Sequence, residues 1–329
     1  MPEPHSRDRP DVRARLAVAL TVAATSAALV SLYYRVHPHL QADFDPLWFA
    51  ARALVAGENP YRVVADLGWE WPLYYPIPAL LIVLPFAILP MAIARGVFVA
   101  VMTGLLAFLI TRRAWWPLLA LPSAAFFQSV TYAQWSPLLT AAVLIPVLGG
   151  LLVLKPSTGL VLFLTRPSWR AVAGGALLLL ISFAIRPSWF WEWRESIRSV
   201  THLPAILRPG GFLLLLALLR WRRPEARLIA LLAVIPVRPT YYEALPLLVL
   251  VPSSMRHLLI LVMGVNVAFL VNSRLPLPPT VDAMDAAAWT TLLAFLYIPS
   301  LVLLLLRENR PEPFAIADAG GPPSSAVCS

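Results

Sequence analysis

Strongly apolar runs recur along nearly the whole chain, separated by proline, glycine and arginine. Of its 329 residues, 59% are hydrophobic and only 13% are charged, whereas soluble proteins average about 45–50% apolar and about 25% charged residues. The runs are rich in Leu, Ala and Val, and they lack the alternating pattern of about ten residues that marks a membrane β-barrel strand. We therefore expect an all-α polytopic membrane protein without a soluble domain.

The apolar runs predict about ten to twelve transmembrane helices. The first run, 16–34, is longer than the apolar region of a typical signal peptide, so we expect a retained span. Several others are shorter than the roughly 17–25 residues of a simple crossing, which implies tilted, broken or re-entrant helices. The further runs are 76–90, 96–111, 116–130, 137–152, 153–165, 171–185, 210–221, 226–238, 244–252, 256–272 and 288–306.

Arginines at the ends of the apolar runs give the chain its net charge of +9. This placement is typical of cytoplasmic anchoring and argues against nucleic acid as a partner. It predicts that both termini are cytoplasmic, although Arg112 and Arg113 oppose the layout between residues 111 and 165. We expect one transmembrane domain, 1–310, with outer segments at 35–75 and 186–209, the second carrying interfacial tryptophans. The Pro/Gly/Ser-rich tail, 311–329, is predicted to be disordered.

Two carboxylates, Asp43 and Asp45, begin a long aromatic-rich segment after the first apolar run. Asp45 directly precedes Pro46, a combination typical of a helix N-cap followed by proline at the first helical position. Asp43 could be a similar cap or a solvated loop residue. A carboxylate at the membrane face could also be a general base that takes a proton from a sugar hydroxyl.

Lys155 is the only lysine, and it interrupts the apolar stretch LLVLKPSTG. An ionisable residue within a membrane segment suggests a functional role, although a long side chain can also extend to the interface. Together with Ser157, Thr158 and Gly159, Lys155 would suit a phosphate group.

Other polar residues interrupt the remaining runs. Arg52 and the cations of the outer segments could hold a lipid phosphate or simply anchor the chain at the interface. Glu243 could be a second acid or base, or an acid at a helix start. The sequence contains no HExxH or GxSxG pattern and one cysteine, Cys328, so we expect no metal site, disulfide framework or serine hydrolase.

The order of these residues resembles the GT-C-type glycosyltransferases of family 87, the DUF2029 group. Members begin with a span, then D-F-x-x-x-W-x-A-A-R-A-L-L-x-G-x-x-P-Y and a Y-P-P-x re-entry, followed by G-Q-x-x-P, L-K-P and P-x-x-x-x-Y. Ala133 stands where the family has glycine before Gln134. The first-loop matches are Asp43, Phe44, Trp48, Ala50, Ala51, Arg52, Ala53, Leu54, Gly57, Pro60, Tyr61, Tyr75, Pro76 and Pro78; the later ones lie at 133–137, 154–156 and 239–242.

The resemblance implies a GT-C bundle in a bacterial inner membrane, with an active site that faces the extracytoplasmic side. It implies inverting transfer of a mannose-like hexose or a pentose from a polyprenyl-phosphate donor to a lipid or glycan acceptor, without metal or cofactor. Asp43 would be the catalytic base. An inactive GT-C-like scaffold or lipid-binding protein and a lipid or solute transporter are the alternatives. The expected donor-phosphate and substrate-binding residues are Lys155, Arg52, Tyr61, Tyr75, Gln134, Tyr242 and Glu243.

Overall fold

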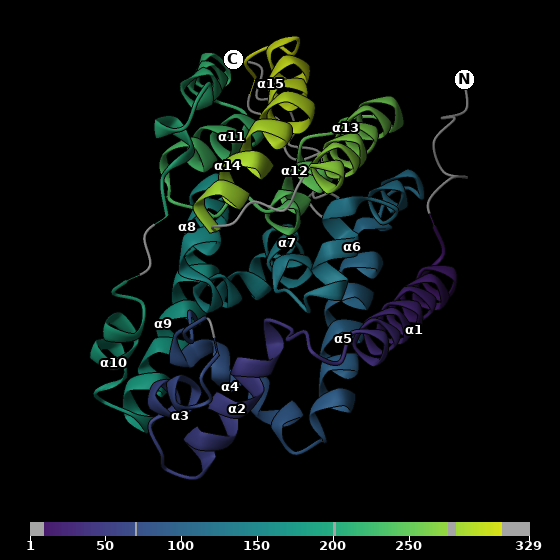
Figure 1. Ribbon diagram of the computed structural model, residues 1–329. Coiled ribbons are helices and arrows are strands. Elements are labelled where there is room, and N and C mark those ends of the chain that lie inside the picture. Colours follow the sequence, from purple (N-terminus) through teal and green to yellow (C-terminus); the bar gives the residue numbers. More distant parts are fainter. Residues whose placement is uncertain (1–9, 70, 200–201, 276–280, 311–329) are drawn as a thin grey trace, which may run out of the picture.

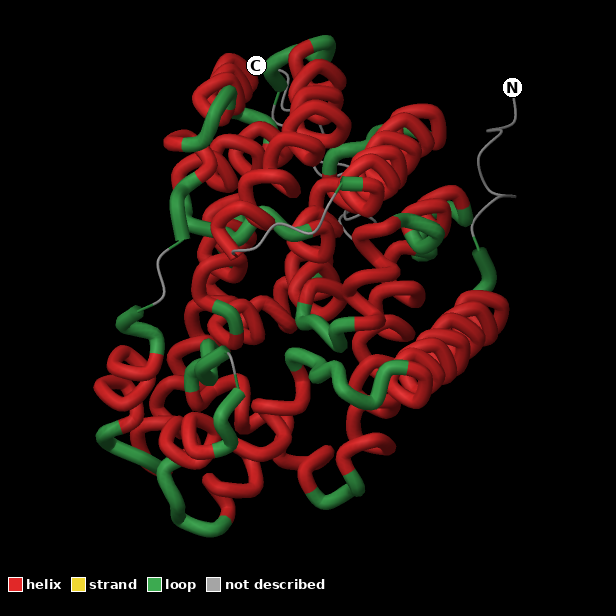
Figure 2. Tube along the Cα trace, in the orientation of Figure 1, coloured by secondary structure: helices red, strands yellow, loops and turns green. Residues whose placement is uncertain are grey.

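The computed structural model describes residues 10–69, 71–199, 202–275 and 281–310, and every regular element within these ranges is helical (Figure 2). The predicted disordered tail, 311–329, lies outside them. The α-helices are α1 (Val12–Val36), α2 (Phe44–Val55), α3 (Pro60–Asp66), α4 (Ile77–Ala87), α5 (Met91–Ile110), α6 (Ala124–Thr131), α7 (Ser136–Leu144), α8 (Pro156–Thr165), α9 (Trp169–Ile185), α10 (Trp189–Ser196), α11 (Pro224–Val234), α12 (Leu245–Leu250), α13 (Met255–Arg274), α14 (Val281–Leu292) and α15 (Ile298–Leu305). The 3-10 segments are η1 (Trp116–Ala120), η2 (Pro146–Leu154), η3 (Ala205–Leu207), η4 (Gly211–Arg220) and η5 (Tyr241–Ala244), and η6 (Leu293–Tyr297) is a π-helix.

Four helical segments are long and apolar enough to cross a membrane: α1, α5, α13 and the continuous stretch from α14 through η6 to α15. The pair α9 and α10, bent by 98°, makes a fifth if it is counted as one broken span. The described part of the chain is thus all helical and has several helices able to span a membrane, which is consistent with the polytopic membrane protein that the composition predicts. Fewer long helices are present than the ten to twelve crossings that the sequence predicts. The remaining apolar runs form short helices, Ile77–Ala87 and Gly211–Arg220 among them.

Proline divides these shorter runs. Pro146 and Pro156 occupy the first turns of η2 and α8, where the missing backbone N–H is tolerated. The 3-10 geometry of η2 partly offsets its shortness, because a rise of about 2.0 Å per residue stretches nine residues over about 18 Å. The sequence pattern therefore locates apolar runs well but does not give their path through the bundle.

The helices divide between two ends of the molecule. Helices α2, α3 and α10 lie together at one end, and α11, α13 and α15 lie at the other (Figure 1). Helix α1 packs along α5 at the edge and leaves apolar side chains such as Leu20 and Leu32 exposed, as expected of a face that contacts lipid. Helix α7 is buried along its whole length, and the site described below lies beside its N-terminal end.

Candidate functional site

A cavity of about 610 Å³ opens between the first loop, the start of α8, helix α10 and the segment that precedes η5. This volume lies within the usual range of small-molecule sites. Five residues that the sequence predicts for the site line it: Asp43, Tyr75, Lys155, Tyr242 and Glu243. Residues more than 190 positions apart therefore share one pocket.

Asp43 is the carboxylate that faces the cavity. Its side chain is exposed to the cavity, while the dense protein around it limits hydration. Burial among these atoms raises the pKa of Asp43 to about 6, although nearby Lys155 and Arg238 act in the opposite direction. A carboxylate with a pKa near 6 is ionised at neutral pH and basic enough to accept a proton.

The side-chain amide of Gln134 bridges Asp43 and Lys155. Its Nε2 group donates a hydrogen bond to Asp43 Oδ2, and its Oε1 accepts one from Lys155 Nζ at 3.2 Å. The sequence predicts a substrate-binding role for Gln134, but the side chain is buried and does not line the cavity. Its contacts are those of a residue that supports the site from behind.

Lys155 is held by an ion pair with Glu243. Thr158 donates a hydrogen bond of 2.7 Å to the second oxygen of Glu243, and the Tyr242 ring centroid lies 5.0 Å from the Lys155 ammonium. Glu243 therefore holds the Lys155 ammonium in place through an ion pair rather than simply favouring a helix start. Close packing explains the glycine at position 159, because a Cβ there would lie 1.8 Å from the carbonyl oxygen of Leu152.

The turn after α6 holds Asp43 and Gln134 in register. Tyr132 caps α6, and its carbonyl accepts the backbone N–H of Asp43 at 3.1 Å. Ala133 then adopts a positive φ of 51°, the left-handed conformation that glycine favours. Ala133 therefore occupies a position whose backbone conformation is strained for alanine and would suit glycine.

Aromatic side chains and Arg238 form the opposite wall. Trp69, Trp71 and Trp193 line the cavity. Arg238 lies over the Trp71 ring, 5.2 Å from its centroid, and its Nε donates to Asp285 at 2.9 Å. Among the residues that the structure describes, no hydrogen bond engages its two terminal nitrogens, so they can bind an anion from the cavity.

His202 also lines this wall. Burial and the adjacent Arg238 lower the pKa of His202, which favours the neutral imidazole at pH 7. Arg238 and Lys155 are therefore the cations of the cavity.

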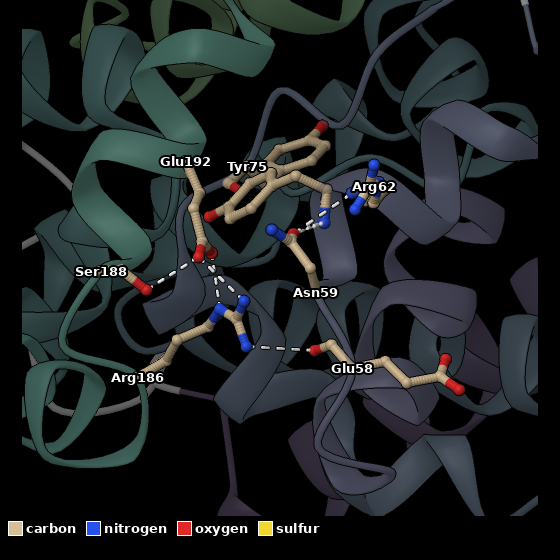
Figure 3. Close-up of polar contacts among 8 residues, drawn as sticks. Glu58, Asn59, Arg62, Tyr75, Arg186, Ser188 and Glu192 are labelled. Carbon is tan, nitrogen blue, oxygen red and sulfur yellow. Dashed lines mark hydrogen bonds and ion pairs between the residues drawn. The ribbon is translucent and has the colours of Figure 1, made fainter.

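Helix α10 closes one side of the cavity and is fastened to the first loop. Arg186, in the bend after α9, binds both oxygens of Glu192 at 2.5 and 2.8 Å and donates to the Glu58 carbonyl at 3.3 Å. Figure 3 shows the Glu58 carboxylate pointing away from this contact. Trp193 Nε1 donates to the Tyr74 carbonyl at 2.9 Å. The segment predicted to be interfacial keeps one indole, Trp191, largely exposed, while Trp189 and Trp193 face inward.

The turn GENPY has a clear local explanation. Gly57 has a positive φ of 76° after the end of α2, and Asn59 accepts the backbone N–H groups of Tyr61 and Arg62 as the N-cap of α3 (Figure 3). Tyr61 is buried outside the cavity, and its hydroxyl donates to the Tyr75 carbonyl at 3.4 Å. Tyr61 therefore positions Tyr75 rather than contacting a ligand.

Besides those of Gln134 and Tyr61, two further predicted roles are wrong. Asp45 is not the N-cap, because α2 begins one residue earlier at Phe44 and Asp43 occupies the cap position. Asp45 is instead buried and binds Arg95 through two hydrogen bonds of 2.9 and 2.8 Å. Arg52 does not reach the cavity, because it lies on the exposed face of α2 and stacks on Trp48.

The sequence interpretation did not identify Arg95, the indoles of the first loop or Asp285. A lone arginine within the apolar run of α5 was a usable signal, because an ionisable group there requires a partner. The indoles and Asp285 carry no comparable signal, since only the fold brings them to the cavity.

Comparisons with known proteins add no relative: no family model matches the chain, and no curated protein or solved structure shows significant similarity to it.

Proposed function

We propose that this protein is an inverting glycosyltransferase that moves a sugar from a polyprenyl-phosphate donor to a hydroxyl of a lipid or glycan acceptor. The observation that carries the proposal is the cavity in which an accessible Asp43, with a pKa of about 6, lies near Lys155 and Arg238. This combination supplies a base for one reactant and cations for an anionic leaving group.

In the proposed reaction, Asp43 accepts the proton of the acceptor hydroxyl. The acceptor oxygen forms a bond to the anomeric carbon from the side opposite the phosphate, and the bond between that carbon and the phosphate oxygen breaks. The electron pair of the broken bond leaves with the polyprenyl phosphate. The terminal nitrogens of Arg238 and the remaining N–H of Lys155 would stabilise its charge.

The aromatic wall supports a carbohydrate ligand. Indole and phenol rings offer flat apolar faces with polar edges, which suit the C–H face of a mannose-like hexose or a pentose. The exposed apolar sides of α1 and α9 suit contact with lipid, and a polyprenyl chain that lies in the bilayer beside the cavity is part of the proposal. A GT-C arrangement in a bacterial inner membrane, with the cavity facing outward and both termini cytoplasmic, is part of the same proposal.

The experiment uses purified protein in proteoliposomes with radiolabelled polyprenyl-phosphate mannose and membrane lipid extract as acceptor. Asp43→Asn keeps the size of the side chain but removes the base, so we expect transfer to fall by about 10²–10⁴-fold. Asp66→Asn is the matched control, because Asp66 is an exposed acid on the same loop outside the cavity. Undiminished transfer by folded Asp43→Asn would rule out Asp43 as the base.

A further inference from the structure

The most complete side-chain network of the cavity runs from Thr158 through Glu243, Lys155 and Gln134 to Asp43. Its members come from α6–α7, α8, η5 and the first loop, so the fold assembles it from four separate segments. Of these five residues, only Gln134 forms hydrogen bonds with both the lysine and the candidate base. Gln134 is therefore the residue through which the rest of the network can affect the position of Asp43.

The two neighbours of Gln134 fix the orientation of its amide. The NH₂ group faces a carboxylate and the carbonyl faces an ammonium, so each end meets a partner of complementary charge. Rotating the amide by 180° would place the carbonyl against Asp43 and the NH₂ group against Lys155, which is unfavourable at both ends. Glu243 and Thr158 hold Lys155 in the place that enforces this choice.

The backbone adds a second constraint on the same pair. The Asp43 N–H binds the carbonyl of Tyr132, two residues before Gln134, and the left-handed Ala133 directs the chain between them. Two hydrogen bonds, one from the backbone N–H of Asp43 and one to its Oδ2, thus hold Asp43 against the turn at residues 132–134. Its other oxygen, Oδ1, has no hydrogen-bond partner within the described part of the chain and remains available to the cavity.

We propose that Gln134 is a positioning residue: Lys155 and Glu243 orient its amide, which binds Asp43 Oδ2 and leaves Oδ1 directed at the acceptor hydroxyl. The proposal rests on the glycosyltransferase function for its purpose, and it replaces the substrate-binding role that the sequence predicts for Gln134. A substrate-binding residue would chiefly change KM, whereas a positioning residue chiefly changes kcat.

A first test measures the Asp43 titration without any activity assay. Unfolding free energy in nanodiscs is measured from pH 4 to 8 for wild type and Asp43→Asn. Because folding raises the pKa of Asp43, wild type should lose stability relative to Asp43→Asn as pH rises from about 4 to about 6, and then level off.

The same pair is then compared in a Gln134→Leu background. The Gln134→Leu change removes a hydrogen bond to ionised Asp43 and should raise the pKa of Asp43 in the folded protein. The pH at which the stability difference stops changing should therefore rise by about one unit. Gln134→Asn, whose amide is one methylene too short to reach both partners, should give a smaller shift and serves if the leucine variant does not fold. Gln128→Leu is the matched control, because Gln128 lies on α6 and does not line the cavity.

The outcomes separate the two proposals. An unchanged Asp43 titration in both Gln134 variants, or a loss of stability that is equal at all pH values, would overturn the positioning role. A shifted titration in a protein that transfers no sugar from any polyprenyl-phosphate donor would support the positioning role and count against the glycosyltransferase. Where transfer is observed, Gln134→Leu should lower kcat at least tenfold and change the donor KM less than twofold; the reverse pattern would restore a substrate-binding role.

Discussion

Asp43 and Asp45 lie two residues apart on one loop, yet the protein surrounds them in opposite ways. Asp45 is 2% exposed, binds both nitrogens that Arg95 offers it and accepts the backbone N–H of Ala42 at 3.0 Å. Asp43 has a single side-chain donor and opens onto the cavity. One carboxylate is fully satisfied by the protein, and the other keeps an oxygen for a ligand.

This difference teaches how a loop can present a reactive group. The Asp45–Arg95 pair fastens the start of α2 to α5, and the Arg95 guanidinium also lies 4.0 Å from the centroid of the Tyr34 ring on α1. Three helices are thus joined through Asp45 and Arg95, two residues along the chain from Asp43. A rigid neighbour of this kind allows Asp43 to remain in a fixed place with few contacts of its own.

The largest expected effect comes from breaking the ion pair between Asp45, the fully bonded carboxylate, and Arg95. Arg95→Met would leave Asp45 buried without its cation, which typically costs about 3–5 kcal/mol. Chemical unfolding of the variant measures the loss. The double variant Asp45→Asn/Arg95→Met removes both charges and should recover most of the stability; a single variant as stable as wild type would contradict the fastening role.

A smaller effect is expected where α10 closes the cavity over the open carboxylate. Arg186→Met removes a partly buried, two-point ion pair and the bond to the Glu58 carbonyl, so α10 should loosen by about 1–2 kcal/mol. Hydrogen exchange of residues 189–196 reports the change.

Arg198→Met provides the matched control for that measurement. Its pair with Glu195 is about three-quarters exposed, and its loss should cost less than about 0.5 kcal/mol. Equal exchange rates in the two variants would show that the Arg186 contacts do not hold α10.

The smallest effect concerns the strained turn that supports Asp43. Ala133→Gly should stabilise the protein by about 0.5–1 kcal/mol, because glycine adopts the positive φ without a Cβ clash. Ala125→Gly, within α6, should instead destabilise it by about 1 kcal/mol or more. A destabilising effect at both positions would contradict the observed backbone conformation at Ala133.

The sequence predicts those features that depend on local composition or on an ordered motif. Apolar runs predict an all-helical membrane protein, and the ordered motif brings Asp43, Lys155 and Tyr242 into one set that the structure also brings together. The polyprenyl-phosphate donor and the transfer reaction stay predictions.

Other features depend on long-range packing and could not be read from the pattern. The Asp45–Pro46 dipeptide favours a cap, but the buried Arg95, 50 residues away, provides a stronger partner. Arg52 belongs to the motif, yet the periodicity of α2 places it on the exposed face. Local preference is outweighed at both positions by what the folded chain places nearby.

The central claim is that Asp43, the open carboxylate, is the base for sugar transfer. The most direct test is the initial rate of transfer from polyprenyl-phosphate mannose between pH 4.5 and 8.5 at low donor concentration, where kcat/KM reports the free enzyme. With a pKa of about 6, the wild-type rate should fall about tenfold per pH unit below 6 and level off above about 7, and Asp43→Asn should show residual transfer without this limb. A limb near pH 6 that persists unchanged in Asp43→Asn would contradict the account.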